Sequence, residues 1–285
     1  MSTAQNFTSR LKAAWQATNS LVCVGLDPEP KKFPDRFRDA PGGIFEFNKA
    51  IVDATRDLVC AYKPQFAHYA AHGAEAQLEH TIDYIKTTAP KAIVILDSKR
   101  GDIGSTAEQY AQEAFDRYGA DAVTVNPYLG RDSVEPFLKH ASKGVIVLCR
   151  TSNPGARDLQ DLHVGPGKTL FQHVAEMVAR DWNSAGNCML VVGATYPEEL
   201  ADIRKRVGDD LPFLVPGVGA QGGDVAKVMA AGKTAAGTGL VISSSRAILY
   251  ASSGGDFAEA SRKAAQDLRD SINSHRQMHD IKNTR

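Results

Sequence analysis

The sequence predicts a single (β/α)8 TIM barrel, and three observations lead to that prediction. Eight short apolar runs recur along the 285 residues, and longer stretches with helical spacing of apolar residues separate them. Eight such repeats in about 250 residues are the pattern of a closed barrel of parallel strands. No linker rich in Pro and Ser divides the chain, so we expect one domain over residues 1–285, with a helix at each end. A doubly wound open sheet shows a similar alternation, but the count of eight favours the barrel.

The expected strands are short and rich in β-branched residues. Their ranges are 21–27, 59–67, 92–99, 122–128, 144–150, 189–195, 213–219 and 239–244. The clearest helix is STAEQYAQEAFDRY at 105–118, where Ala107 and Ala111 fall on one face. Ser105, followed three residues later by Glu108, predicts a capping box at the start of this helix.

Composition argues against several classes of protein. Lys plus Arg and Asp plus Glu both number 33, so the formal net charge is zero and we expect no nucleic-acid partner. The N-terminal segment lacks the apolar core of a signal peptide, and no run of about eighteen apolar residues occurs. We therefore expect a soluble cytoplasmic protein with no membrane contact.

The cysteines and histidines do not predict a metal site. The four cysteines are far apart and form no C-x-x-C pair, which also argues against a disulfide framework. The pairs His68/His72 and His275/His279 have the spacing of a helical metal site, but Tyr69 stands where a zincin needs glutamate. We interpret these histidines as surface or packing residues.

Polar residues gather at the C-terminal ends of the expected strands. They are Asp27, Lys63, Asp97, Lys99, Asn126, Thr151 and Ser152. In a barrel these ends form one rim, where active sites are built. Charged residues also end strands because loops are solvated, but Lys63 stands between Tyr62 and Pro64 in an apolar stretch, where an unpaired ammonium is costly. We therefore predict a charged site at the rim.

The segment ILDSKRGDIGST places three of the charges close together. Side chains alternate along a strand, so Asp97 and Lys99 share one face and start roughly 6.6 Å apart. Asp102 lies beyond the strand and can turn back to this barrel or reach a neighbouring subunit. With Lys63, the mouth holds two ammonium groups and two carboxylates. Opposite charges keep such a lysine protonated, which makes it a proton donor rather than a base or an imine-forming nucleophile. An ordinary salt-bridge network at the barrel top is the alternative.

A glycine-rich segment, VPGVGAQGGD, follows the seventh expected strand. Its glycines match G-x-G-x-x-G, but no acidic residue occurs between Asp224 and Asp256, so the ribose contact of a dinucleotide site is missing. In a barrel, the loops after strands seven and eight form the usual phosphate site. Backbone N–H groups near Gly222 and Gly223 can face the anion, and Arg246 can add a cation.

These segments resemble orotidine 5′-phosphate decarboxylase in its longer bacterial type, the type 2 subgroup. LDSKRGDIGST is similar to the D-x-K-x-x-D-I-x-x-T signature of that family. The other similar segments are VGLDP, YKPQFA, VNPYLGRDS, TSNPG, PGVGAQGGD and SSSRAI, so the resemblance spans the whole chain. It implies decarboxylation of orotidine 5′-phosphate to uridine 5′-monophosphate in de novo pyrimidine biosynthesis, without cofactor or metal.

The resemblance also implies a role for each rim residue. Asp27 is expected to hydrogen-bond the ribose, and Lys63 to bridge the ribose and the charge network. Asp97 is expected to lie against the substrate carboxylate, while Lys99 protonates C6 of the pyrimidine as carbon dioxide leaves. Ser152 is expected at the edge of the pyrimidine.

The remaining implied contacts concern the phosphate and a second subunit. Gln221 and Arg246 are expected to hold the 5′-phosphate. Asp102 and Thr106 match positions that, in the family, enter the active site of the other subunit, so the resemblance implies a homodimer with shared active sites. The long segment 152–168 is expected to help cover the substrate.

Two other functions fit parts of the pattern. Magnesium-dependent relatives on the same barrel, sugar-phosphate decarboxylases or aldolases, share D-x-K-x-x-D but carry an acidic metal ligand where this chain has Lys63. The charge of Lys63 would repel a divalent metal. A non-catalytic nucleotide-binding module is expected to lack Asp97 or Lys99, and both are present.

Overall fold

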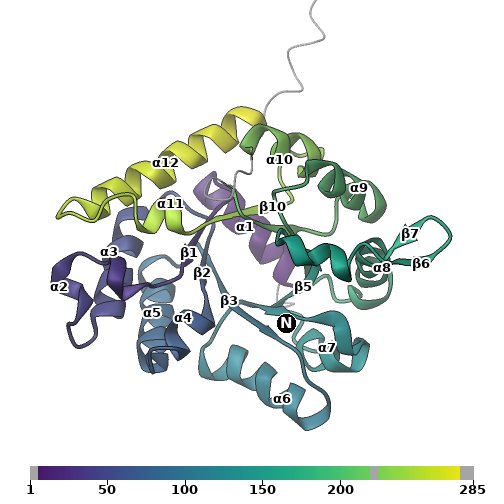
Figure 1. Ribbon diagram of the computed structural model, residues 1–285, viewed down its shortest axis with the longest axis horizontal. Helices are drawn as coiled ribbons and strands as arrows, with labels where there is room; N and C mark the ends of the chain where they lie inside the picture. The colour runs from purple at the N-terminus through teal and green to yellow at the C-terminus, as the bar shows by residue number, and fades with distance from the viewer. Residues whose placement is uncertain (1–5, 219–223, 277–285) are drawn as a thin grey trace, which may run out of the picture.

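In the computed structural model, which describes residues 6–218 and 224–276, eight parallel strands close into a barrel (Figure 1). The order around the barrel is β1-β10-β9-β8-β5-β4-β3-β2. The strands are β1 (Val22–Leu26), β2 (Ala61–Pro64), β3 (Ile93–Arg100), β4 (Ala122–Val125), β5 (Gly144–Arg150), β8 (Cys188–Val192), β9 (Phe213–Pro216) and β10 (Leu240–Ser244). The predicted single-domain (β/α)8 barrel is confirmed.

Helices surround the barrel and connect its strands (Figure 1). They are α1 (Phe7–Thr18), α2 (Asp35–Arg38), α3 (Gly43–Thr55), α4 (Phe66–Ala70), α5 (Glu75–Thr88), α6 (Gly104–Gln112), α7 (Arg131–Leu138), α8 (Leu170–Met177), α9 (Pro197–Val207), α10 (Val225–Gly232), α11 (Arg246–Leu249) and α12 (Phe257–Arg276). Within the ranges that the structure covers, none of these helices is long and apolar enough to cross a membrane.

The barrel strands are buried on both faces, as parallel strands covered by helices are. Every residue of β1, β8 and β10 is buried. The expected strand at 59–67 ends earlier, at Pro64, because the chain turns into α4 at Phe66. The expected strand at 122–128 ends at Val125 because a short 3-10 turn begins at Pro127.

The start of α6 differs from its prediction. The helix begins at Gly104 with Ile103 as the N-cap, so Ser105 already lies inside the first turn. The predicted capping box of Ser105 and Glu108 is therefore wrong, because the chain enters the helix one residue earlier than that motif requires. The predicted apolar face of this segment is present, since Ala107 and Ala111 are both buried.

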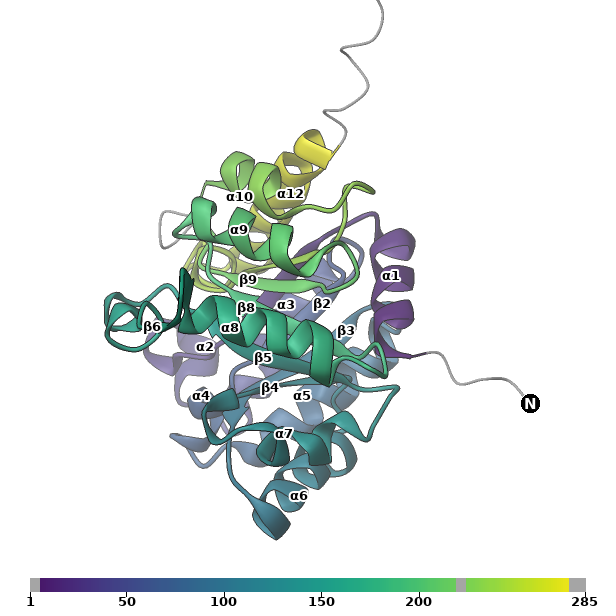
Figure 2. The ribbon, with the colours of Figure 1, turned by 90° about the vertical axis from the view of Figure 1, so that its right-hand side faces the viewer.

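A small hairpin interrupts the long segment after β5. It consists of β6 (His163–Gly165) and β7 (Lys168–Thr169), which pair antiparallel outside the barrel. The sequence patterns did not predict these two strands. Figure 2 shows the hairpin projecting from the side of the molecule that lies opposite α1.

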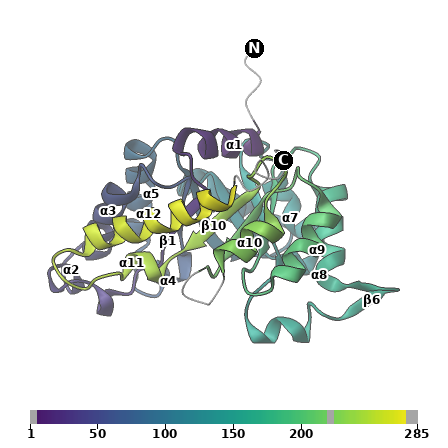
Figure 3. The same cartoon turned by 90° about the horizontal axis from the view of Figure 1, so that it is seen from above.

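The last turn of α12 reaches the end of α1, at the edge of the molecule where α1 lies in Figure 3. Phe7 of α1 is fully buried, and its ring lies so near Gly144 that a Cβ there would come within 2.5 Å of the ring. Asn19, which ends α1 in a left-handed conformation, accepts hydrogen bonds from Asn273 through its carbonyl, at 3.0 Å, and from Arg276 through its side chain, at 3.3 Å. These contacts join the end of α1 to the end of α12.

Candidate active site

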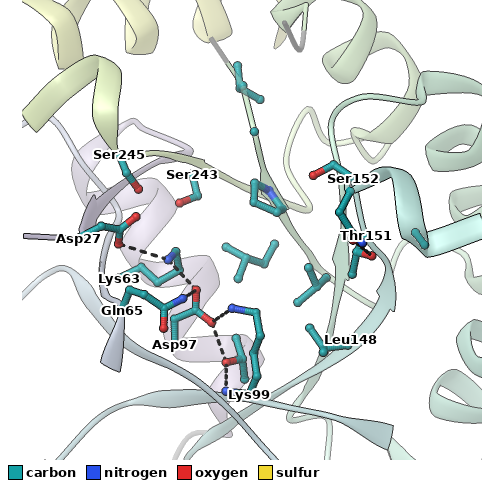
Figure 4. A pocket seen from close by; sticks show the side chains of 18 of the residues that line it. Asp27, Lys63, Gln65, Asp97, Lys99, Leu148, Thr151, Ser152, Ser243 and Ser245 are labelled. Atoms are coloured by element: carbon teal, nitrogen blue, oxygen red, sulfur yellow. Dashed lines mark hydrogen bonds and ion pairs between the residues drawn. The ribbon is translucent and has the colours of Figure 1, made fainter. Parts of the chain in front are cut away.

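A cavity of about 690 Å³ opens at the C-terminal ends of the barrel strands. Its charged wall carries Asp27 at the end of β1, Lys63 on β2, and Asp97 and Lys99 on β3. Ser243, Ser244, Ser245 and Arg246 line it from β10 and the start of α11, while Leu148, Val191 and Leu214 supply apolar surface. Figure 4 shows Thr151 and Ser152 across the cavity from the charged wall. Six of the seven predicted rim residues line this cavity. The exception is Asn126, whose side chain instead accepts from the Tyr128 N–H at 3.0 Å.

Asp97 is the centre of a hydrogen-bonded charge network (Figure 4). The Lys63 ammonium donates to Asp97 Oδ2 at 2.7 Å, and the Lys99 ammonium donates to Asp97 Oδ1 at 2.6 Å. Gln65 Nε2 also donates to Asp97 Oδ2, at 3.0 Å. Lys63 Nζ lies 3.9 Å from Asp27 Oδ1, so it bridges the two carboxylates. Lys63 and Asp97 are buried, whereas the Lys99 side chain is 45% exposed and reaches into the cavity.

Burial and pairing act in opposite directions on the two buried charges of this network. Burial favours the neutral form of Lys63, but the carboxylates of Asp97 and Asp27 outweigh it and raise the Lys63 pKa. Burial likewise favours the protonated form of Asp97, but the ammonium groups of Lys63 and Lys99 outweigh it and hold the Asp97 pKa well below its ordinary value. Lys63 and Asp97 are therefore both charged at neutral pH.

The backbone at Lys99 has an unusual conformation for a strand residue. Lys99 has φ of 47°, in the left-handed region, and the register of β3 against β4 shifts between Leu96 and Arg100. Thr124 of β4 faces this irregularity: its Oγ1 accepts from the Lys99 N–H at 2.9 Å and donates to Asp97 Oδ1 at 2.9 Å. Sequence reasoning missed Thr124, because a threonine in AVTVNPY matches an ordinary β-branched strand residue.

A buried arginine anchors the loop that follows β5. Arg150 is 1% exposed, and its guanidinium pairs with Glu199 of α9 at 3.0 Å and with Asp161 of the loop at 3.0 Å. Gln160 accepts from the Thr151 N–H at 2.9 Å and donates to Thr151 Oγ1 at 2.8 Å. These contacts fix the base of the loop. Sequence reasoning missed Arg150, whose partners lie far along the chain.

Ser152 and several later residues of this loop line the cavity. The loop comes close to Gly193, the residue after β8, where an added Cβ would come within 2.9 Å of Ser152 Cβ and 3.1 Å of Ser152 N. The absence of a side chain at Gly193 therefore allows the close approach of Ser152.

Asp102 and Thr106 do not line the cavity of their own chain, as far as the described residues show. Asp102 is half-buried and accepts from the Ile103 N–H at 2.8 Å, while Thr106 is exposed on α6. Large apolar side chains are exposed in the same region, at Ile103, Tyr128 and Leu129. These three residues follow β3 and β4.

The predicted phosphate site is only partly visible. Arg246, the first residue of α11, lines the cavity and is exposed. Gln221, Gly222 and Gly223 lie outside the described residues. In the described part of the chain, no group of three potential metal-ligating side chains occurs, and His68 Nδ1 lies 3.1 Å from the Pro28 carbonyl oxygen.

Comparisons with known proteins point to one family. A family model described as "Orotidine 5'-phosphate decarboxylase / HUMPS family" matches residues 20–263. The orotidine 5′-phosphate decarboxylase of Aromatoleum aromaticum is 61% identical over 271 residues, covering 95% of this chain and 100% of that protein. That of Cellvibrio japonicus is 63% identical over 271 residues, covering 94% and 98%.

Solved structures point to the same family. The Leishmania donovani OMP decarboxylase superposes with a TM-score of 0.82 at 38% identity, over 95% of this chain and 99% of that one. The Leishmania donovani UMP synthase superposes with a TM-score of 0.84 at 40% identity, over 95% of this chain and 57% of that one.

Proposed function

Because this chain belongs to the orotidine 5′-phosphate decarboxylase / HUMPS family, and decarboxylates orotidine 5′-phosphate to uridine 5′-monophosphate in pyrimidine biosynthesis, we propose that Lys99 is the acid of this reaction. The observation that carries the proposal is the position of the Lys99 ammonium, 2.6 Å from a buried carboxylate and reaching into the cavity. Lys63 in turn holds Asp97 in place, so the carboxylate that pairs with the Lys99 ammonium belongs to a rigid charge network.

The proposed chemistry starts with cleavage of the bond between C6 and the carboxylate. Carbon dioxide leaves, and the electron pair stays on C6, where no adjacent carbonyl can delocalise it. A fixed ammonium beside C6 stabilises that charge through preorganised electrostatics. A Lys99 N–H proton then passes to C6, which completes uridine 5′-monophosphate, and Lys99 regains a proton from solvent.

Asp97 and the binding residues have complementary proposed roles. Asp97 faces the substrate carboxylate, where charge repulsion raises the energy of the ground state and disappears as carbon dioxide leaves. Asp27 and Lys63 bind the ribose, and Ser152 meets the pyrimidine edge. Arg246 holds the 5′-phosphate, so that binding energy remote from C6 positions the ring. The expected roles of Gln221, Gly222 and Gly223 stay predictions.

We also propose a homodimer with shared active sites. Asp102 and Thr106 lie outside the cavity of their own chain, beside the exposed apolar side chains of Ile103, Tyr128 and Leu129. An apolar surface at the rim of a charged cavity suits a second copy of the chain, which would bury it and bring Asp102 to the neighbouring cavity. The expected cytoplasmic location likewise stays a prediction.

Turnover of orotidine 5′-phosphate in excess EDTA, followed by ultraviolet absorbance, tests the role of Lys99. Wild type should be active, and Lys99→Ala should lose at least about 10³-fold in kcat, since a positioned acid contributes about 10²–10⁴-fold. Lys263→Ala is the matched control, because Lys263 also pairs with an aspartate, at 2.6 Å, but on the exposed surface of α12.

Binding of uridine 5′-monophosphate to Lys99→Ala should stay within a few fold of wild type. Unchanged turnover, or loss of folding, would contradict the proposed role of Lys99. Activity that appears only after magnesium is added would instead favour the magnesium-dependent reaction of sugar-phosphate relatives.

A further inference from the structure

We propose that Thr124 is a positioning residue that holds Lys99 and Asp97 in the geometry required for proton transfer to the substrate. This inference rests on the proposed role of Lys99 as the acid. Thr124 itself lies on β4 and is 1% exposed, and β4 pairs with β5 in register at this residue, opposite Ile146. Thr124 is therefore part of the barrel wall and not of a loop at the rim.

The backbone of Lys99 has a conformation that needs support. A φ of 47° is rare for a residue with a side chain, and it persists only where surrounding contacts hold it. The irregularity is local: β3 advances four residues, from Leu96 to Arg100, while β4 advances two, from Val123 to Val125. The Lys99 N–H consequently meets a side chain, Thr124 Oγ1, at 2.9 Å.

The hydroxyl of Thr124 connects the Lys99 backbone to the Asp97 carboxylate. A threonine hydroxyl has one proton to donate and lone pairs to accept. Thr124 uses the lone pairs for the Lys99 N–H and the proton for Asp97 Oδ1, each at 2.9 Å. Asp97 Oδ1 also accepts from the Lys99 ammonium at 2.6 Å. The four groups form a closed ring that fixes the Lys99 backbone and the tip of its side chain relative to the same carboxylate oxygen.

The other contacts of the network do not replace the hydrogen bond from the Lys99 N–H to Thr124. Asp97 Oδ2 is held by Lys63 and Gln65, so the carboxylate stays in place without Thr124. The Lys99 backbone has no such second support from those residues. Loss of the hydroxyl therefore leaves the charged network around Asp97 intact but removes the hydrogen bond that holds the Lys99 backbone, so the Lys99 ammonium can shift relative to the substrate. Displacing a reacting group by about 1 Å can cost about 10²-fold in rate.

The test compares Thr124→Val with Thr124→Ser. Valine keeps the β-branched shape but has no hydroxyl, whereas serine keeps the hydroxyl and loses a methyl group. We expect Thr124→Val to lower kcat by about 10- to 100-fold with KM for orotidine 5′-phosphate within about 3-fold of wild type. Thr124→Ser should keep kcat within about 3-fold of wild type. A purely structural threonine would not give this split between kcat and KM.

Thr55→Val is the matched control. Thr55 is also fully buried and hydrogen-bonded, to the Ile51 carbonyl and to Tyr62, both at 2.8 Å, but it lies on α3 away from the cavity. Its kcat should equal that of wild type. If Thr124→Val does not fold, Thr124→Ala and Thr124→Ser are compared instead, with the same expectation for the variant that lacks the hydroxyl.

Three results would overturn the role of Thr124. They are an unchanged kcat in Thr124→Val, a rise in KM at constant kcat, and a loss of kcat in Thr124→Ser as large as in the variant without a hydroxyl. The Lys99→Ala variant separates this failure from failure of the proposed function. If Lys99→Ala is inactive while Thr124→Val turns over normally, only the positioning role is wrong. If Lys99→Ala remains fully active, the acid itself has been misassigned.

Discussion

Replacing Asp97 with asparagine should lower the free energy of unfolding as well as the rate of the reaction. The substitution keeps the size of the side chain but removes the charge that pairs with Lys63 at 2.7 Å. The Lys63 side chain is only 7% exposed, and its other carboxylate, Asp27, lies 3.9 Å away. Breaking a buried ion pair by removing one partner typically costs about 3–5 kcal/mol. Because Asp27 still offsets part of the charge, we expect roughly 3 kcal/mol, or a fall in Tm of about 6–12 °C.

The pH dependence of this loss follows from the shifted pKa values. The pKa of Asp97 is lowered in the folded protein, so its contribution to stability is present above its unfolded pKa of 3.8 and is lost as the pH falls below that value. The pKa of Lys63 is raised, so its contribution is fully present below its unfolded pKa of 10.5 and is lost only at more alkaline pH. The difference between wild type and Asp97→Asn should therefore be constant from about pH 5 to 8 and shrink below about pH 4.

Urea unfolding at a fixed protein concentration, followed by the fluorescence of the buried Trp15 and Trp182, measures this difference. Asp57→Asn is the control, because Asp57 is 58% exposed and pairs with Arg262 at the surface, where such a pair contributes less than about 1 kcal/mol. The stabilising role of the Lys63–Asp97 pair is refuted if Asp97→Asn loses no more stability than Asp57→Asn. It is also refuted if the stability lost by Asp97→Asn is as large at pH 3 as at pH 7.

Three further changes test other parts of the site. Gly193→Ala should displace Ser152 and raise KM for orotidine 5′-phosphate about 10-fold in steady-state assays, the equivalent of one lost hydrogen bond. An unchanged KM would contradict the proposed contact of Ser152 with the substrate. Gln160→Ala should release the loop after β5 and increase its rate of tryptic cleavage several-fold over wild type; equal rates would show that the loop is held elsewhere. Lys99→Ala and Asp102→Ala should each be inactive, yet a reassociated equal mixture should recover about a quarter of wild-type activity, because half of the dimers are mixed and one of their two sites is intact. No recovery would exclude a shared site.

The sequence predicted the barrel and its charged rim because both depend on patterns that are local along the chain. A short apolar run predicts each strand, and the barrel topology then brings the C-terminal ends of the strands to one face. The contact between Asp97 and Lys99 follows from two-residue alternation in the same way. Lys63 was recognisable because a charge in an apolar stretch requires a partner.

The features that sequence reasoning missed depend on partners distant in sequence. Thr124 hydrogen-bonds to the Lys99 N–H only because the register of β3 against β4 shifts beside it. No residue near Lys99 signals its left-handed backbone. Arg150 acquires its partner Glu199 from a helix 49 residues later. The misplaced capping box shows the opposite error: Ser105 fits a local motif, but the entry of the chain into α6 decides where the helix starts.

The junction of α1 and α12 at Asn19 has a consequence for how this barrel can be combined with other proteins. Asn273 and Arg276 bring the end of α12 to the end of α1. The described ends of the chain therefore lie away from the residues that line the cavity. A second enzyme fused before α1 or after α12 would attach there, and substrate access would stay open.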